Sequence, residues 1–246
     1  MKKALNFLKN YLAQILIVIT IIPLAIVFKQ SFIKLLPCLI TVAVMYLDSK
    51  FNRYARIVGA CNCVVYSIGY YTDGLYGSVL TALLYSAPLQ IVTFILWNKN
   101  KYKQGTKVKL LNNKNRFFAF LGIIVIAFVY IIIFSNFQTA NYTILQGIQF
   151  SLGLVATVLI MFGVLEGMFI NIISTVLNFV QYLMMVLSGQ FNQSTYLVMA
   201  VYSTYCLIVG TINWIKVYKE QQAEKVGNID ISKFTDGQVI FADNKN

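Results

Sequence analysis

Residues 169–184 read FINIISTVLNFVQYLM, an apolar segment interrupted at regular intervals by hydrogen-bonding side chains. The polar residues Asn171, Ser174, Asn178 and Gln181 recur at spacings of three, four and three, which places them on one face of a helix. Because an unpaired amide is costly to bury in hydrocarbon, this face must contact protein or a water-filled path. The stretch therefore predicts a membrane-spanning helix with a functional polar face.

The composition of the whole chain is that of a membrane protein. Of its 246 residues, 59% are hydrophobic and 11% are charged, a balance that ordinary soluble domains lack. The chain has no histidine, which removes the commonest general base and the commonest metal ligand. Its four cysteines lie in apolar segments without the spacing of a zinc or redox site. The sequence thus predicts a protein that is not an enzyme and that needs no cofactor.

Eight apolar segments follow one another along the chain, each near the ~20 residues that cross a bilayer. We therefore expect an all-α polytopic membrane protein with about eight transmembrane helices. Lysines precede the first segment, as in a signal peptide, but the segment is too long for one and lacks a cleavage site. The predicted spans are residues 11–28, 32–46, 55–70, 75–97, 117–135, 143–162, 165–188 and 195–215.

The basic residues are distributed unevenly between the two sides of the predicted bundle. With both termini in the cytoplasm, 18 of the 20 lysines and arginines fall inside, and only Lys29 and Lys34 fall outside. The positive-inside rule therefore favours a multi-pass protein of the inner or plasma membrane with cytoplasmic N- and C-termini. The net charge of +12 then reflects topology, so we expect the lipid bilayer as a partner and no nucleic acid.

Loops and spans divide the chain into six consecutive parts. In the last part we expect little order beyond Gly227, apart from a short strand at residues 237–242. The parts are an extra N-terminal helix (1–30), a first three-helix bundle (31–98), a basic cytoplasmic loop (99–116), a linker helix (117–136), a second three-helix bundle (142–216) and a polar cytoplasmic tail (217–246).

The segments on either side of the linker helix repeat weakly. Both copies begin and end on the same sides of the membrane, which makes them parallel repeats. We therefore expect two parallel three-helix bundles joined by a linker helix, the 3+1+3 arrangement of the SWEET sugar porters, plus the extra N-terminal helix. The matches are Asn62 and Tyr66 with Asn178 and Tyr182 at an offset of 116, and Tyr85, Ser86 and Trp97 with Tyr202, Ser203 and Trp214 at an offset of 117.

Two stretches of these repeats carry a wider resemblance. They are residues 62–98, NCVVYSIGYYTDGLYGSVLTALLYSAPLQIVTFILWN, and residues 177–216 with their closing Asn-Trp-Ile-Lys. In them, and over most of the chain from about residue 55, the sequence resembles the PnuC family of vitamin-uptake transporters. The resemblance implies uptake of nicotinamide riboside, thiamine, riboflavin or a deoxynucleoside, the first being typical of the family. Family members often carry several core tryptophans, whereas this chain has only Trp97 and Trp214.

Amide and tyrosine side chains within the predicted spans are candidates for binding such a substrate. Amides donate and accept hydrogen bonds, and tyrosine rings stack on heterocycles and attract cations. The same side chains can instead join helices, which leaves packing roles open. We expect Trp97 and Trp214 to be interfacial anchors and Asp48 to lie in a loop. The predicted substrate-binding residues are Asn62, Tyr66, Tyr85, Gln90, Asn178, Gln181, Tyr182 and Tyr202.

The acidic residues bear on the mechanism of transport. No carboxylate lies near the middle of a predicted span, and ion-coupled carriers usually hold such groups in the membrane. We therefore predict facilitated diffusion with alternating access, driven by intracellular trapping of the solute. The alternative is a substrate-capturing membrane subunit of an ATPase-driven uptake system. The residues alone leave open whether the protein forms a homo-oligomer.

Overall fold

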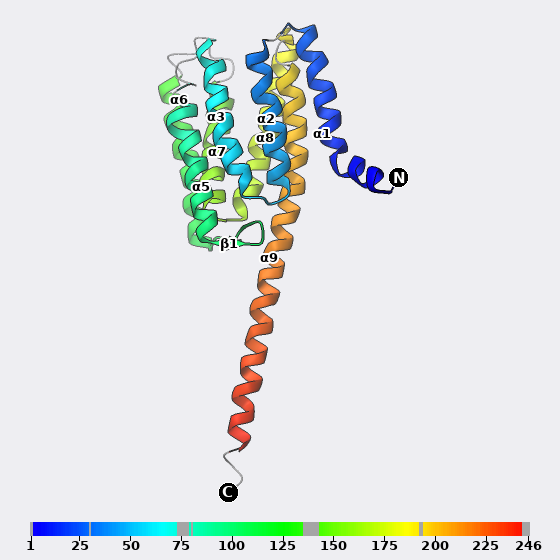
Figure 1. Ribbon diagram of the computed structural model, residues 1–246. Helices are drawn as coiled ribbons and strands as arrows, with labels where there is room; N and C mark the ends of the chain where they lie inside the picture. The colour runs from blue at the N-terminus through cyan, green and yellow to red at the C-terminus, as the bar shows by residue number, and fades with distance from the viewer. Residues whose placement is uncertain are drawn as a thin grey trace.

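The computed structural model describes residues 2–29, 31–72, 79, 81–134, 143–191 and 194–242, and most of these residues are helical. The helices form one bundle, and the last of them extends far beyond its end (Figure 1). They are α1 (Lys2–Val27), α2 (Phe32–Ser49), α3 (Tyr54–Thr72), the π-helical turn η1 (Thr81–Ser86), α5 (Ala87–Lys99), α6 (Asn113–Phe134), α7 (Thr143–Met161), α8 (Glu166–Leu187) and α9 (Ser194–Ala242).

Several of these helices are long and apolar enough to cross a membrane. Among the described residues, four meet this criterion, and the apolar segments of two more, Tyr11–Val27 and Leu35–Ser49, are shorter. The prediction of an all-helical, multi-pass membrane protein is thereby confirmed. The four are Asn113–Ile133, Ile144–Met161, Glu166–Leu187 and Ser194–Glu224.

The fourth predicted span, residues 75–97, is not one regular helix. Residues 73–78 and 80 lie outside the described part, and η1 then leads into α5. Pro88 lies in the first turn of α5 and has no backbone N–H to donate to the preceding turn. A wider π-helical turn accommodates such a break, and turns of this kind occur frequently at functional sites. Tyr85 and Ser86 lie in this turn.

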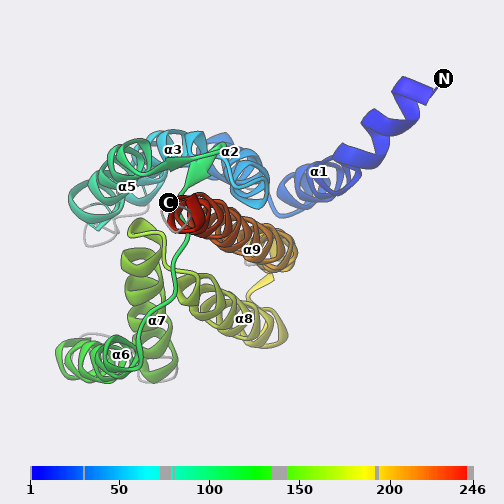
Figure 2. The same cartoon turned by 90° about the horizontal axis from the view of Figure 1, so that it is seen from below.

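Helices that follow one another in the chain pack side by side in two groups. In the first, α3 contacts α2, η1 and α5; in the second, α8 contacts both α7 and α9. The two groups meet where α2 packs on α9 and α5 packs on α7, and each forms an arc when the bundle is seen along its axis (Figure 2). Helix α6 packs on α7, and α1 packs on α9 and α2. The two groups therefore pack against each other through α2, α5, α7 and α9.

One glycine sets the spacing between α7 and α8. A Cβ atom added at Gly167 would lie 2.9 Å from the carbonyl oxygen of Ala156 and 2.9 Å from the Cβ atom of Leu159. Only a residue without a side chain permits this approach of the two backbones. Gly167 therefore brings the polar faces of α7 and α8 close together.

The basic loop and the tail differ from the predictions. The loop contains a small antiparallel hairpin of β1 (Lys101–Tyr102) and β2 (Gly105–Thr106). Helix α9 continues to Ala242, so the strand expected at residues 237–242 is wrong. Lysine, glutamate, glutamine and alanine follow residue 217, and these are strong helix formers.

The hairpin packs against the extended part of α9. The Tyr102 hydroxyl donates to Glu224 Oε1 at 2.7 Å, and Lys103 forms an ion pair with Glu220. The backbone N–H of Val108 donates to Gln221 Oε1 at 3.1 Å. These contacts fix the loop that follows α5 to the helix that ends the second group. We call this end of the bundle the hairpin end.

Candidate functional site

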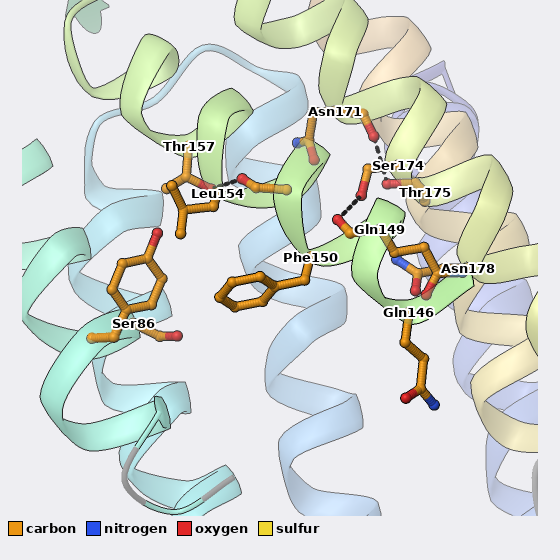
Figure 3. A pocket seen from close by; sticks show the side chains of 12 residues that line it. Ser86, Gln146, Gln149, Phe150, Leu154, Thr157, Asn171, Ser174, Thr175 and Asn178 are labelled. Atoms are coloured by element: carbon orange, nitrogen blue, oxygen red, sulfur yellow. Dashed lines mark hydrogen bonds between the residues drawn. The ribbon is translucent and has the colours of Figure 1, made fainter. Parts of the chain in front are cut away.

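A cavity of about 440 Å³ lies between η1, α7 and α8. Its volume is within the ~300–1,000 Å³ of small-molecule sites. Most of the lining side chains are polar, and none of those that the structure describes carries a formal charge. The lining residues are Tyr85, Ser86, Gln146, Gln149, Phe150, Gly153, Leu154, Thr157, Asn171, Ser174, Thr175 and Asn178 (Figure 3).

The polar face of α8 supplies one wall of this cavity. Asn171, Ser174 and Asn178 line it, as their helical spacing predicted. The hydroxyl of Ser174 donates to the backbone carbonyl of Gln149 on α7 at 3.2 Å, a bond drawn in Figure 3. Gln181, the last member of the predicted stripe, is buried but does not line the cavity.

Helix α7 supplies a second polar wall that the sequence interpretation did not identify. Gln146, Gln149, Gly153 and Thr157 recur at spacings of three, four and four and all line the cavity. This is the same helical signal that marks α8. The hydroxyl of Thr157 is already bonded to the backbone carbonyl of Gly153 at 2.7 Å. The two glutamines therefore carry most of the hydrogen-bonding capacity of this wall.

Asn62 and Tyr66 lie outside the cavity lining. The Asn62 amide donates to Thr41 Oγ1 at 2.8 Å, and the Tyr66 hydroxyl is 3.4 Å from the same oxygen. Both side chains thereby join α3 to α2. The Asn62 Oδ1 atom is buried and has no hydrogen-bond partner among the residues described.

Three further candidates on α8 and α9 also contact protein elsewhere. Tyr182 stacks on Tyr196 with ring centroids 5.6 Å apart. The buried Tyr202 hydroxyl donates to the backbone carbonyl of Val42 at 3.2 Å, which joins α9 to α2. Gln181 is buried outside the cavity lining, so only Tyr85 and Asn178 of the eight predicted residues line the cavity together.

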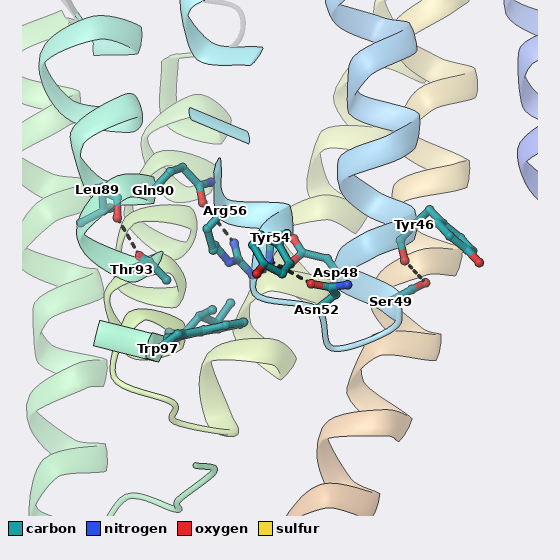
Figure 4. Close-up of polar contacts among 11 residues, drawn as sticks. Tyr46, Asp48, Ser49, Asn52, Tyr54, Arg56, Leu89, Gln90, Thr93 and Trp97 are labelled. Carbon is teal, nitrogen blue, oxygen red and sulfur yellow. Dashed lines mark hydrogen bonds and ion pairs between the residues drawn. The ribbon is translucent and has the colours of Figure 1, made fainter. Parts of the chain in front are cut away.

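Gln90 belongs to a different arrangement, at the hairpin end. Arg56 Nη2 lies 2.6 Å from Asp48 Oδ1, and Arg56 Nη1 donates to Gln90 Oε1 at 3.4 Å (Figure 4). The Arg56 guanidinium also lies over the Trp97 ring, 4.8 Å from its centroid. Asp48 is in the last turn of α2 rather than in a loop, so that prediction is wrong.

The two tryptophans are buried and not interfacial anchors. Trp97 and Trp214 are each 1% exposed, and their ring centroids are 5.6 Å apart. Trp97 Nε1 donates to the carbonyl of Ile160 at 3.1 Å, and Phe51 meets the edge of Trp214 at 5.2 Å. The prediction failed because Trp97, near the end of α5, contacts Trp214, within α9, across the two groups, and a count along either helix does not reveal this contact.

We call Asp48, Phe51, Arg56, Trp97 and Trp214 the hairpin-end cluster. A void of about 20 Å³ borders Asp48, Arg56 and Trp214 of this cluster and is also lined by Asn171. Asn171 lines the large cavity as well. Asn171 therefore lies between the large cavity and the small void that borders the cluster.

Comparisons with known proteins bear on the family and the fold of the chain. A family model described as nicotinamide mononucleotide transporter matches residues 31–216. A solved structure, the crystal structure of the vitamin B3 transporter PnuC, superposes with a TM-score of 0.67 at 22% identity, covering 85% of this chain and 93% of that one. No curated protein sequence matches the chain significantly. Both matches are transporters, which confirms the prediction that the chain is not an enzyme.

Proposed function

The chain belongs to the nicotinamide mononucleotide transporter family, and from that premise we propose that it takes up nicotinamide riboside across the membrane. The substrate class follows from the cavity between η1, α7 and α8, whose lining residues are amides, hydroxyls and aromatic rings. Amides and hydroxyls suit a ribose and a carboxamide. The rings of Tyr85 and Phe150 suit a flat, positively charged pyridinium.

The described lining of the cavity has no charged side chain, and this is the reason to propose a nucleoside rather than its phosphate as the substrate. Proteins bind phosphate groups with arginine, lysine or helix N-termini, and the lining residues include no arginine or lysine. A phosphate dianion would lose its hydration in this cavity without an opposite charge to replace it. The cavity therefore favours the riboside over the mononucleotide for which the family is named.

The arrangement of the helices supports alternating access. In this proposal α2, α3 and α5 form one bundle and α7, α8 and α9 the other, with α6 as the linker and α1 as the extra helix. The cavity lies where the bundles face each other, and the hairpin-end cluster holds them together on one side of it. Trp97 contacts Ile160 and Trp214 across the two bundles. Release of the solute toward the hairpin end requires these contacts to break.

No ion coupling is needed for this cycle. Asp48 is a partly buried carboxylate in the hairpin-end cluster, and its ion pair with Arg56 leaves the pair without net charge. Transport is then facilitated diffusion, and trapping of the solute by intracellular chemistry drives net uptake. By the positive-inside rule, the basic loops favour a cytoplasmic location for the hairpin end and both termini.

Within the cavity we assign solute contact to Asn178 and Tyr85. Asn178 offers an amide from the second bundle, and Tyr85 offers a ring and a hydroxyl from the first. In the conformation described here, Asn62, Tyr66 and Gln90 make contacts within the first bundle, and Tyr182 and Tyr202 pack against α9 and α2. These residues join helices outside the cavity lining.

Uptake by purified protein in liposomes tests the proposal. Labelled nicotinamide riboside, nicotinamide mononucleotide, thiamine, riboflavin and deoxynucleosides are compared, with and without an ion gradient. We expect saturable entry of nicotinamide riboside that stops at equal concentrations inside and outside. Accumulation of unmodified solute under an ion gradient would contradict facilitated diffusion. No entry of any solute by folded protein would favour a subunit that needs an ATPase partner.

A further inference from the structure

The loop between α5 and α6 crosses from one bundle to the other at the hairpin end. Its first half, residues 100–106, contains the hairpin and is held by the turn between α2 and α3. The backbone N–H of Arg53 donates to the carbonyl of Gln104 at 3.0 Å. The Phe51 ring lies so close to Gly105 that it leaves no room for a Cβ atom there. The hairpin is therefore fixed to the first bundle.

The second half of the loop, residues 107–112, is held by the second bundle instead. The backbone N–H of Lys109 donates to the carbonyl of Gly163 at 2.9 Å, and the N–H of Leu165 donates to the carbonyl of Lys109 at 3.0 Å. The N–H of Leu111 donates to the Glu166 carboxylate at 3.2 Å. These partners lie at the turn from α7 to α8, and the chain then runs past α9 to α6 (Figure 2). This half is therefore fixed to the second bundle.

Two side-chain contacts join the hairpin to α9, which belongs to the second bundle. Lys103 forms an ion pair with Glu220, and the Tyr102 hydroxyl donates to Glu224 Oε1 at 2.7 Å. The side chains of Lys103 and Glu220 are 51% and 48% exposed. Exposed ion pairs are weak and are screened by salt. These contacts can therefore break and re-form while the backbone hydrogen bonds on either side persist.

The same two contacts lie next to the buried tryptophans. Trp97 is in the last turns of α5, just before the hairpin, and Trp214 precedes Glu220 on α9. The hairpin and Trp97 are joined by a short stretch of chain, as are Glu220 and Trp214. A hairpin that is bound to α9 therefore helps to keep Trp97 against Trp214.

We propose that the ion pair between Lys103 and Glu220 and the hydrogen bond between Tyr102 and Glu224 form a latch, which holds the two bundles together at the hairpin end and opens in each transport cycle. This inference rests on the alternating access of the proposed function and adds the loop to the elements that control it. Reversing one charge of the latch shifts the protein toward the state that is open at the hairpin end.

The reactivity of Cys206 toward a maleimide measures this opening in the purified protein. Cys206 is 3% exposed and lines the small void beside Trp214, so the reagent reaches it when the bundles part. Mass spectrometry of the modified peptides distinguishes Cys206 from the exposed Cys61. In Lys103→Glu we expect Cys206 to react about fivefold faster, because repulsion replaces an exposed ion pair.

Two variants make this result specific to the latch. The exchange Lys103→Glu with Glu220→Lys restores opposite charges, so Cys206 should react at the parental rate. Lys101→Glu makes the same change of charge on the same hairpin, at an exposed residue without an ion pair in the described part of the chain. This variant should also keep the parental rate.

A cross-link that holds the latch closed tests its part in transport. A bifunctional maleimide joins Lys103→Cys to Glu220→Cys in protein reconstituted in liposomes, and uptake of nicotinamide riboside should be lost. The control joins Arg116→Cys to Glu166→Cys, which replaces an ion pair between α6 and α8 that does not involve the first bundle. Uptake should persist in this control and in the single-cysteine variants treated with the same reagent.

The outcomes separate the latch from the proposed function. Parental reactivity of Cys206 in Lys103→Glu, or uptake that persists after the latch is cross-linked, would overturn the latch and leave the proposed function intact. A Lys103→Glu protein that unfolds at a much lower temperature than Lys101→Glu would also overturn it, by showing that the contact serves folding. Absence of saturable uptake by the folded parent would contradict the proposed function, while the reactivity of Cys206 would still decide whether the latch exists.

Discussion

The cavity and the hairpin-end cluster are adjacent, and both contain polar side chains. The two regions differ in whether those side chains have hydrogen-bond or ion-pair partners. In the cavity, Gln149 and Tyr85 keep buried atoms without partners among the described residues. In the cluster, Asp48 pairs with Arg56, and Trp97 donates to a backbone carbonyl. A polar lining around a large cavity favours ligand binding, whereas paired groups around a small void favour closure. Polarity within a membrane span therefore does not by itself identify a binding site.

The largest expected effect is the loss of stability when the ion pair of the hairpin-end cluster is broken. Asp48→Ala leaves the Arg56 guanidinium buried without its carboxylate, because the two side chains are 17% and 10% exposed. Breaking one half of a buried ion pair costs about 3–5 kcal/mol. We expect a large fall in the thermal unfolding midpoint of the purified protein. The double variant Asp48→Ala with Arg56→Met should recover most of it, and a single variant as stable as the parent would contradict the pairing.

The two repeat-related asparagines should respond differently to the same substitution. Asn178→Ala removes a cavity amide, so we expect the KM for nicotinamide riboside uptake to rise about tenfold, as for one lost hydrogen bond, with stability unchanged. Asn62→Ala instead breaks the bond to Thr41 and should lower stability by about 1 kcal/mol without a tenfold rise in KM. Liposome uptake and thermal unfolding measure the two effects, and identical behaviour of both variants would contradict the assignment.

A smaller effect is expected for Trp97→Phe. Phenylalanine keeps a ring beneath Arg56 but loses the bond from Nε1 to the Ile160 carbonyl. We expect a loss of about 1–2 kcal/mol in the free energy of unfolding. The control is Phe120→Leu on α6, whose ring is 61% exposed and whose replacement should change stability by less than ~0.5 kcal/mol. An equal loss of stability in Trp97→Phe and Phe120→Leu would contradict a stabilising hydrogen bond from Trp97.

The smallest expected effect is a change in the pKa of Tyr102 in the hairpin. The hydrogen bond to Glu224, together with desolvation and the charges of Glu224 and Glu220, raises the pKa of Tyr102 to about 12. Because folding raises this pKa, the contact contributes its full stability to the folded protein at pH values below the ordinary tyrosine pKa of 10.0. This stability is lost as the pH rises through about 12. Glu224→Gln should lower this pKa toward 10.0 in a tyrosinate absorbance titration. An unchanged titration would contradict the contact.

The sequence predicted those features that a single helix determines. The apolar segments are long enough to mark the spans, and the helical spacing of Asn171, Ser174 and Asn178 identified one cavity wall correctly. The same spacing marks Gln146 and Gln149 on α7, and applying it to every span would have identified the second wall. The resemblance to the PnuC family, made on residues 62–98 and 177–216, is confirmed by the family match over residues 31–216.

The features that depend on two helices could not be predicted in this way. Trp97 and Trp214 were expected at the interface because each ends an apolar span, but their burial results from the contact between α5 and α9. Asp48 was expected in a loop because it follows the second predicted span, residues 32–46, and its partner Arg56 lies on the next helix. Gln90 and Asn62 have polar neighbours on other helices that spacing along one helix does not show.

The most direct test of the central claim, that the uncharged cavity binds a nucleoside, is a comparison of nicotinamide riboside with nicotinamide mononucleotide by equilibrium binding to the purified protein. The two ligands differ only by a phosphate, for which the described lining has no positively charged side chain. We predict that the riboside binds at least about tenfold more tightly, since the dianion loses hydration without gaining a partner. Equal or tighter binding of the mononucleotide would contradict the account.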